Sequence, residues 1–257
     1  MSLSTDKDYD LSLKIEQGFG PDGLGILSVT DVPGYSSLRR NLLHLAPKLA
    51  NLPKEVKDDL EDPNSRYPSY CGSNVWPRST LPELELAFKA LGKLIFDVGL
   101  MVAYHCDQYG DNSMSSWCGW HTDNGSLTGL TCAIFTRDGE EIPCPDSAAG
   151  LYIRTRNDQI VKVVYGVDNI AYQIGETAEI LSGGILRATP HCVQAPKGKE
   201  SSGVERSTFA LFMQPDWDEK LSFPEEVHIH KELIPSNASL TYGEYSEMVL
   251  GKYYDKK

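Results

Sequence analysis

Apolar side chains recur every three or four positions between residues 84 and 102, which is the spacing of one face of an α-helix. The repeating positions are Leu84, Ala87, Phe88, Leu91, Leu94, Ile95, Val98, Met101 and Val102. Pro82 precedes them, and proline suits the first turn of a helix. We predict a long helix from Leu81 to about Tyr104 that packs on the outside of a sheet.

From about Trp117 onwards the apolar runs are short, and Gly, Asp-Gly or Pro-Asp turns separate them. The predicted strands are residues 128–136, 150–154, 160–164, 171–174, 179–181, 191–194 and 208–214. Many short, regularly spaced strands are typical of an all-β barrel or jelly roll. The predicted fold class is therefore mainly β with flanking helices.

Shorter elements are predicted on both sides of this region. A strand over residues 23–30 is followed by a helix from Ser36 or Ser37 to about Leu49, with one stripe of leucines. A last helix is predicted from Leu240 to Tyr254. Its predicted apolar side consists of Tyr242, Tyr245, Met248 and Tyr253.

The length of 257 residues fits one large domain or two small ones. The net charge of −12 argues against non-specific nucleic-acid binding, which needs a basic surface, and disfavours anionic membranes. No apolar run reaches membrane-spanning length. We therefore expect no nucleic-acid partner and no membrane partner. The acidic charge does not distinguish a small-molecule substrate from a peptide.

The six cysteines, at positions 71, 106, 118, 132, 144 and 192, include no Cys-x-x-Cys pair. A zinc ribbon or a thioredoxin-like motif is therefore not expected. The first residues are polar and acidic and lack the apolar core of a signal peptide. We predict reduced thiols and an intracellular, cytoplasmic protein.

A His-x-Asp triplet, His121 to Asp123, precedes a Gly-Ser turn and an apolar run. On a strand, side chains at positions i and i+2 point to the same face, so the imidazole and the carboxylate would converge. His191 is the candidate third ligand. Two His and one carboxylate with open positions suit Fe(II). The alternative is a hydrogen-bonded surface pair, with His191 as a turn residue after Thr-Pro.

Arg206 and Thr208 open a strongly apolar strand and would share one of its faces. A buried cation without a partner is costly. One interpretation is an internal ion pair with one of the chain's many carboxylates. The other is a ligand carboxylate held by both arms of the guanidinium.

The order His121-x-Asp123, His191, Arg206-x-Thr208 resembles the Fe(II)- and 2-oxoglutarate-dependent dioxygenases, in the branch related to isopenicillin N synthase. The resemblance runs nearly end to end. Arg-x-Thr replaces the family's frequent Arg-x-Ser and keeps the hydroxyl.

Two further stretches, residues 116–120 and 214–217, resemble a plant-type branch of that superfamily. Residues 197–203 read as a loop insertion between His191 and Arg206. Family members usually carry a Tyr near the co-substrate, on a strand before the His-x-Asp triplet. Tyr104 and Tyr109 are the candidates to replace it here.

The resemblance implies a double-stranded β-helix, or jelly-roll, barrel with Fe(II) held by His121, Asp123 and His191. It also implies that 2-oxoglutarate chelates the metal, with its distal carboxylate at Arg206 and Thr208, and that O2 takes the remaining position. Succinate and CO2 would be the co-products when a small organic substrate is oxidised, for example by hydroxylation. Desaturation and ring closure use the same ligands, so the reaction type and the substrate stay open.

Two other functions stay open, because a fold does not fix a function. A catalytically degenerate jelly roll could bind a metal or a ligand carboxylate through Arg206 without turnover. A zinc hydrolase would need a general base near the metal-bound water, and the sequence shows no clear one.

By the same resemblance, we expect a single dioxygenase domain over residues 1–257. It would comprise a lid-like segment (1–80), a spine helix (81–109), a jelly-roll core (117–217) and a C-terminal helical extension (218–257). The sequence does not predict the oligomeric state.

Overall fold

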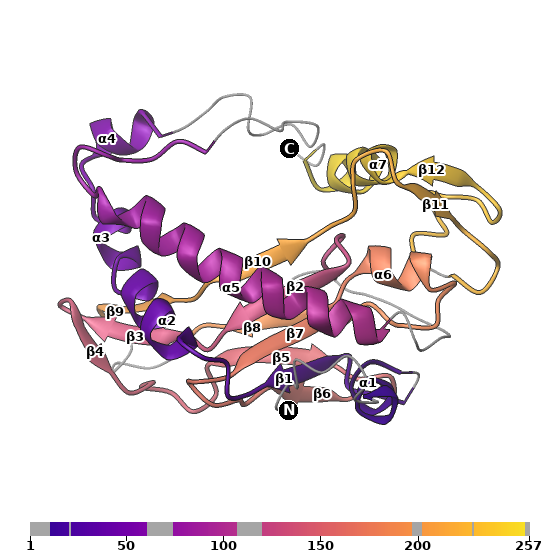
Figure 1. Ribbon diagram of the computed structural model, residues 1–257, viewed down its shortest axis with the longest axis horizontal. Coiled ribbons are helices and arrows are strands. Elements are labelled where there is room, and N and C mark those ends of the chain that lie inside the picture. The colour runs from indigo at the N-terminus through magenta and orange to yellow at the C-terminus, as the bar shows by residue number, and fades with distance from the viewer. Residues whose placement is uncertain are drawn as a thin grey trace.

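The centre of the molecule is an antiparallel four-stranded sheet with the order β1 (Ile26–Val29), β7 (Ile170–Ile174), β2 (Leu127–Thr131) and β10 (Ala210–Met213). The computed structural model describes residues 11–20, 22–60, 74–106, 120–196, 202–227 and 229–254, without the side chains of 104–106 and 252–254. The architecture is mainly β with helices around the sheets (Figure 1).

The long helix α5 (Glu83–Cys106) crosses one face of this sheet (Figure 1). The side chains of Ile95 and Tyr172 belong to one apolar core there, and the Tyr172 hydroxyl donates a hydrogen bond to the Ile95 carbonyl at 2.6 Å. Gly129 permits this close approach, because a Cβ at that position would lie 2.5 Å from Ile95 Cγ2. Since side chains alternate along a strand, Thr128 and Gln173 point to the opposite face.

A second, three-stranded sheet lies on that opposite face, with the order β6 (Ile160–Lys162), β5 (Gly150–Arg154) and β8 (His191–Gln194). The two sheets share a small apolar core that consists of Ile26, Leu151, Ile153 and Ala171. The predicted strands 150–154 and 191–194 are confirmed. The strands in the described residues form separate sheets and do not close into one hydrogen-bonded barrel.

A third sheet has the order β4 (Glu140–Ile142), β3 (Ile134–Arg137) and β9 (Val204–Ser207). The turn between β3 and β4 has Asp138 and Gly139 at φ 53° and 85°, as a tight hairpin requires.

The strands predicted for 128–136 and 208–214 have the wrong bounds. The first is divided into β2 and β3 where the chain leaves the central sheet, and in the second only β10 is a strand, because the chain breaks between β9 and β10. The break between β2 and β3 lies opposite the break between β9 and β10, and the Thr208 hydroxyl donates to the Thr131 carbonyl at 2.9 Å there. Arg39 also occupies this break, donating to the carbonyls of Cys132 and Ala133. Side chains replace the strand ladder at this corner.

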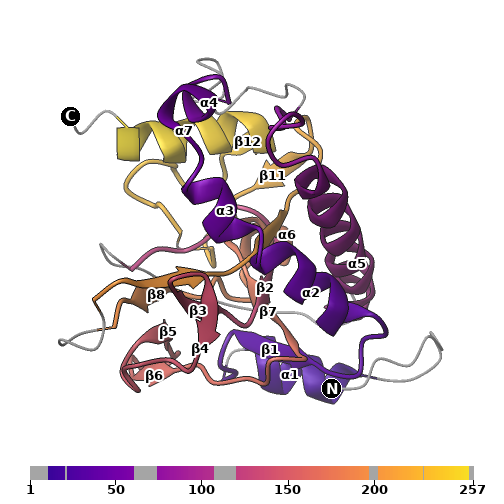
Figure 2. The same cartoon turned by 90° about the vertical axis from the view of Figure 1, so that its left-hand side faces the viewer.

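The N-terminal part forms α1 (Ser12–Phe19), α2 (Tyr35–Leu43), α3 (Ala46–Ala50) and α4 (Lys54–Asp58). The helix predicted from Ser36 or Ser37 to Leu49 is two helices in the structure (Figure 2). Pro47 lies in the first turn of α3, where its missing N–H is tolerated, and cannot continue α2.

The strand predicted at 179–181 is wrong, because these residues lie in helix α6 (Glu176–Leu181). Its backbone N–H groups find acceptors outside the helix: Glu176 N–H donates to the Asp123 carbonyl, and Thr177 N–H to the Gly125 carbonyl. A short apolar run fits a buried helix as well as a strand.

The C-terminal part consists of β11 (Lys220–Ser222), β12 (Ser239–Thr241) and α7 (Tyr242–Tyr254) (Figure 1). It shares a second apolar core with Ile180 of α6 and Ala188. Tyr242 and Tyr245 are buried as predicted, whereas Met248 is 41% exposed, so its predicted place on the apolar side is wrong. The side chain of Tyr253 lies outside the described residues. Among the residues that the structure describes, no helix combines the length and apolar character needed to cross a membrane.

Candidate metal centre and its pocket

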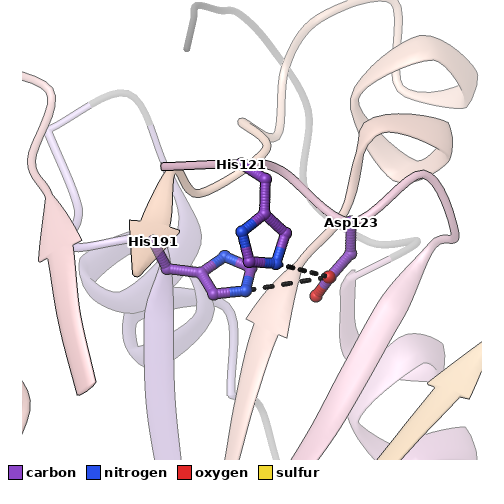
Figure 3. Close-up of side chains that lie close together, drawn as sticks. All are labelled: His121, Asp123 and His191. Atoms are coloured by element: carbon purple, nitrogen blue, oxygen red, sulfur yellow. Dashed lines mark ion pairs between the residues drawn. The ribbon is translucent and has the colours of Figure 1, made fainter. Parts of the chain in front are cut away.

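His121, Asp123 and His191 lie together, each with one potential ligand atom within 4.8 Å of the others' (Figure 3). Asp123 Oδ1 is 4.0 Å from His121 Nε2 and 3.7 Å from His191 Nε2. Asp123 and His191 are buried, and the side chain of His121 is 52% exposed. The arrangement is therefore a three-donor site that is open on the His121 side.

The backbone brings the two histidines side by side. His121 pairs with His191 as a single antiparallel bridge, with N···O distances of 3.0 and 2.9 Å. The predicted strand around the His-x-Asp triplet is reduced to this bridge, and Asp123 lies in the loop before β2. Gly125 follows, where an added Cβ would lie 2.7 Å from the Met213 carbonyl oxygen. The loop is thus packed tightly onto the end of β10.

Two buried residues orient the Asp123 carboxylate. Thr128 Oγ1 donates to Asp123 Oδ2 at 2.6 Å, and Gln173 Nε2 donates to the same oxygen at 2.8 Å. These two residues are register partners on β2 and β7. With Oδ2 occupied by two donors, Oδ1 is left facing the histidines.

His191 has polar neighbours at both ring nitrogens. Its Nδ1 lies 3.0 Å from the Thr189 carbonyl oxygen, which can only accept, so a proton on Nδ1 fits this contact. Gln173 Nε2 lies 3.0 Å from Nδ1 and from Nε2 of the same ring. Burial lowers the pKa of His191, although Asp123 acts in the opposite direction. The ring is therefore suited to bind a metal ion as a neutral ligand.

A pocket of about 190 Å³ contains all three of these residues together with Arg206 and Thr208. Its other walls come from both facing sheets and from the segment after β6: Thr128, Leu130, Thr131, Leu151, Tyr165, Val193, Ala210 and Phe212. The five residues singled out in the sequence thus share one pocket, although Arg206 lies on β9 and Thr208 lies beyond its end.

Arg206 has no carboxylate partner among the described residues. Burial is the largest influence on the pKa of Arg206 and lowers it. The other groups that act on this pKa are Tyr165, Cys132 and Cys144, and none of them is a carboxylate. An internal ion pair with a described residue is therefore excluded. Thr208 is different, because its hydroxyl already donates to the Thr131 carbonyl.

Tyr165 is a pocket residue that the sequence did not single out. It lines the pocket beside Arg206, and burial raises the pKa of its hydroxyl, which therefore stays protonated. It follows β6 and carries no motif, so only the fold reveals its place. Tyr109 and the side chain of Tyr104, the two candidates from the sequence, lie outside the described residues.

A neighbouring cavity of about 270 Å³ shares Leu151, Tyr165 and Arg206 with this pocket. It is bordered by Cys132 and Cys144, which are free thiols together with Cys192, while the side chains of the other cysteines lie outside the described residues. Arg206 and Tyr165 thus form a wall between the two spaces.

The chain is similar to known oxidoreductases, although no family model matches it. It is 30% identical over 119 residues to a Dictyostelium discoideum protein named Probable iron/ascorbate oxidoreductase. The aligned part covers 46% of this chain and 27% of that protein, so the chain spans well under two thirds of its relative.

Solved structures resemble the chain over nearly its whole length. A Neurospora crassa protein, solved in complex with alpha-KG and 5-formyluracil, is 17% identical, with 93% of this chain and 89% of that chain covered and a TM-score of 0.66. The dioxygenase for auxin oxidation of rice is also 17% identical, with coverages of 94% and 90% and a TM-score of 0.60.

A Caulobacter crescentus protein assigned to the 2OG-Fe(II) oxygenase family is 15% identical, with 98% of both chains covered and a TM-score of 0.68. At these identities the likeness concerns the fold. The chain therefore has the fold of the 2OG-Fe(II) oxygenases, and the resemblance to the Fe(II)/2-oxoglutarate-dependent dioxygenases that its sequence predicts is confirmed.

Proposed function

We propose that this protein is a non-haem Fe(II)- and 2-oxoglutarate-dependent oxygenase that oxidises a small organic substrate. The observation that carries the proposal is one pocket that contains both a His-Asp-His donor set and a guanidinium without a described carboxylate partner. The first group suits Fe(II), and the second suits the carboxylate of a co-substrate.

His121, Asp123 and His191 would hold the iron and leave its other positions open. The donor set fits this role, since the imidazole of His191 is buried and Asp123 Oδ1 faces the Nε2 atoms of both rings. When bound, Fe(II) with 2-oxoglutarate and O2 supplies the oxidation, with succinate and CO2 as co-products.

Arg206 would hold the distal carboxylate of 2-oxoglutarate with two parallel hydrogen bonds. Because the Thr208 hydroxyl donates to Thr131, Thr208 would shape the pocket and hold the corner beneath Arg206. Tyr165 would donate a further hydrogen bond to the same carboxylate, since its hydroxyl stays protonated beside Arg206.

The substrate would enter on the side where His121 is exposed. Val193 and Phe212 line the pocket and are 52% and 58% exposed, so part of the rim is apolar. Apolar side chains there suit a small organic molecule with an unactivated C–H bond and help to exclude water from the reaction. Hydroxylation is the reaction we propose.

The chain would form one dioxygenase domain over residues 1–257, with the facing sheets as the two halves of a jelly roll. The lid-like segment (1–80), the spine helix (81–109), the core (117–217) and the C-terminal extension (218–257) are its proposed parts. The shared core of the two sheets and the fold of the neighbours support this arrangement.

The test is succinate formation from 2-oxoglutarate with Fe(II) and O2, in the presence of a metabolite panel followed by untargeted mass spectrometry. We expect turnover in the wild type and none in Asp123→Ala or His191→Ala, because a site that loses one of three protein ligands is incomplete. A degenerate binder would take up metal and 2-oxoglutarate without succinate. Activity with zinc alone would indicate a hydrolase and contradict the proposal.

A further inference from the structure

Thr122 and Asn124, the residues on either side of Asp123, both form side-chain hydrogen bonds with residues outside the pocket. The Thr122 hydroxyl donates to Glu176 Oε1, and Asn124 Nδ2 donates to Ser246 Oγ at 2.7 Å. Neither Thr122 nor Asn124 lines the pocket, whereas Asp123 does. The metal-binding loop therefore has a polar back side with partners of its own.

Glu176 is the centre of this back side. It is only 2% exposed, and the Tyr245 hydroxyl donates to its Oε2 at 2.6 Å. His230 Nε2 lies 3.2 Å from Glu176 Oε1, the same oxygen that accepts from Thr122. Burial raises the pKa of Tyr245, and Glu176 raises it further, so the phenol stays a donor. A buried carboxyl thus has three polar partners.

The backbone of the loop is held from the same side. Glu176 N–H donates to the Asp123 carbonyl at 2.7 Å, and Thr177 Oγ1 donates to the Asn124 carbonyl. A Cβ at Gly175 would lie 2.2 Å from the Gly125 carbonyl oxygen, so only glycine permits this contact. Apart from the bridge between His121 and His191, the described loop has no strand pairing.

Tyr245 and Ser246 are neighbours on α7, near the C-terminal end of the chain. One reaches Thr122 through Glu176, and the other reaches Asn124 directly. Residues far apart in the sequence therefore meet on both sides of Asp123.

We propose that Glu176 and the α7 residues Tyr245 and Ser246 are positioning residues that hold the His121–Asp123 loop in its metal-binding geometry. The proposal rests on the proposed function, since it assigns these residues to the same iron site. The physical reason is that a loop without a strand ladder keeps two ligands aligned only if its other side chains are fixed.

The experiment titrates Co(II) alone into the metal-free protein, with the visible absorption of the bound ion as the readout. Thr122→Val and Tyr245→Phe each remove one hydroxyl from the network, and Thr122→Ser keeps it. Tyr172→Phe is the matched control, because it removes an equally buried tyrosine hydrogen bond, to Ile95, outside the network. Melting temperatures are measured on the same samples.

We expect Thr122→Val and Tyr245→Phe to weaken Co(II) binding about 10- to 100-fold and to change its spectrum. Thr122→Ser and Tyr172→Phe should bind as the wild type does. Unchanged binding in Thr122→Val and Tyr245→Phe would overturn the inference, as would a loss in all variants that follows only the melting temperature. Absence of Co(II) binding in the wild type would refute the proposed function, and the inference with it.

Discussion

At Arg206 the protein partly buries a cation in the pocket of the candidate metal ligands without giving it a described carboxylate partner. Such a residue contributes little to stability, since desolvation of the guanidinium is not offset by an ion pair. Its presence in the pocket is best explained by a ligand that supplies the missing charge.

We predict that Arg206→Met weakens 2-oxoglutarate binding by about 2–4 kcal/mol, or roughly 30- to 1000-fold, because two charge-assisted hydrogen bonds are lost. Arg206→Lys should recover only part of the lost affinity, because an ammonium keeps the charge but cannot form the planar pair of hydrogen bonds. Thr208→Val should instead lower the free energy of unfolding by about 1 kcal/mol, because its hydroxyl donates to the Thr131 carbonyl. Calorimetry with 2-oxoglutarate and melting curves on the same samples test this. A large fall in melting temperature with unchanged affinity would contradict it.

The sequence indicates the candidate ligand residues more readily than the residues that support them. His121 and Asp123 are picked out because the two candidate ligands lie two positions apart. Gln173 and Glu176 are recognised only in the fold, because their partners Asp123 and Thr122 lie 50 and 54 residues away along the chain. No local spacing indicates such a contact, so a support network of this kind requires the tertiary structure.

Among the elements, the sequence predicts three especially well. β5 and β8 match the predicted 150–154 and 191–194, and α5 matches the long apolar repeat. Two of the errors lie where tertiary contacts replace the local pattern. One is at the corner between β2 and β3, where Arg39 binds backbone carbonyls. The other is at α6, whose first N–H groups bind the loop that carries Asp123.

The close contact between α5 and the central sheet gives a second prediction. A Cβ at Gly129 would meet Ile95 at 2.5 Å and Tyr172 at 2.9 Å. Gly129→Ala should therefore destabilise the protein by about 1–3 kcal/mol, because helix and sheet must separate. Chemical denaturation measures the change.

Gly92, also on α5, is the matched control, since its nearest neighbour to an added Cβ is Phe209 at 3.9 Å. Gly92→Ala should stabilise the protein by up to about 1 kcal/mol through helix propensity. Equal effects of the two substitutions would show that backbone preference, and not packing on the sheet, decides the outcome at Gly129.

For the molecule as a whole, contacts of Glu179 and Arg156 link α6 to the segment that leads to β8. Glu179 is fully buried, and its Oε2 accepts a hydrogen bond from the Ala188 N–H at 2.8 Å. Arg156 donates to the carbonyls of Arg187 and Ala188. Burial raises the pKa of Glu179 to about 7, against the lowering effects of Ala188, Arg156 and Arg187.

This raised pKa makes the stability of the whole molecule depend on pH. In the unfolded chain Glu179 ionises near the ordinary glutamate pKa of 4.5, and in the folded protein its pKa is about 7. The folded state therefore binds one more proton between these values, and stability falls as pH rises through them. We predict that the wild type loses on the order of 3 kcal/mol relative to Glu179→Gln between about pH 5 and pH 8. Urea denaturation of both proteins without metal measures the difference, in which the titration of the histidines cancels. Parallel pH curves would mean that Glu179 is ionised in the folded protein, with Arg156 as its effective counter-ion.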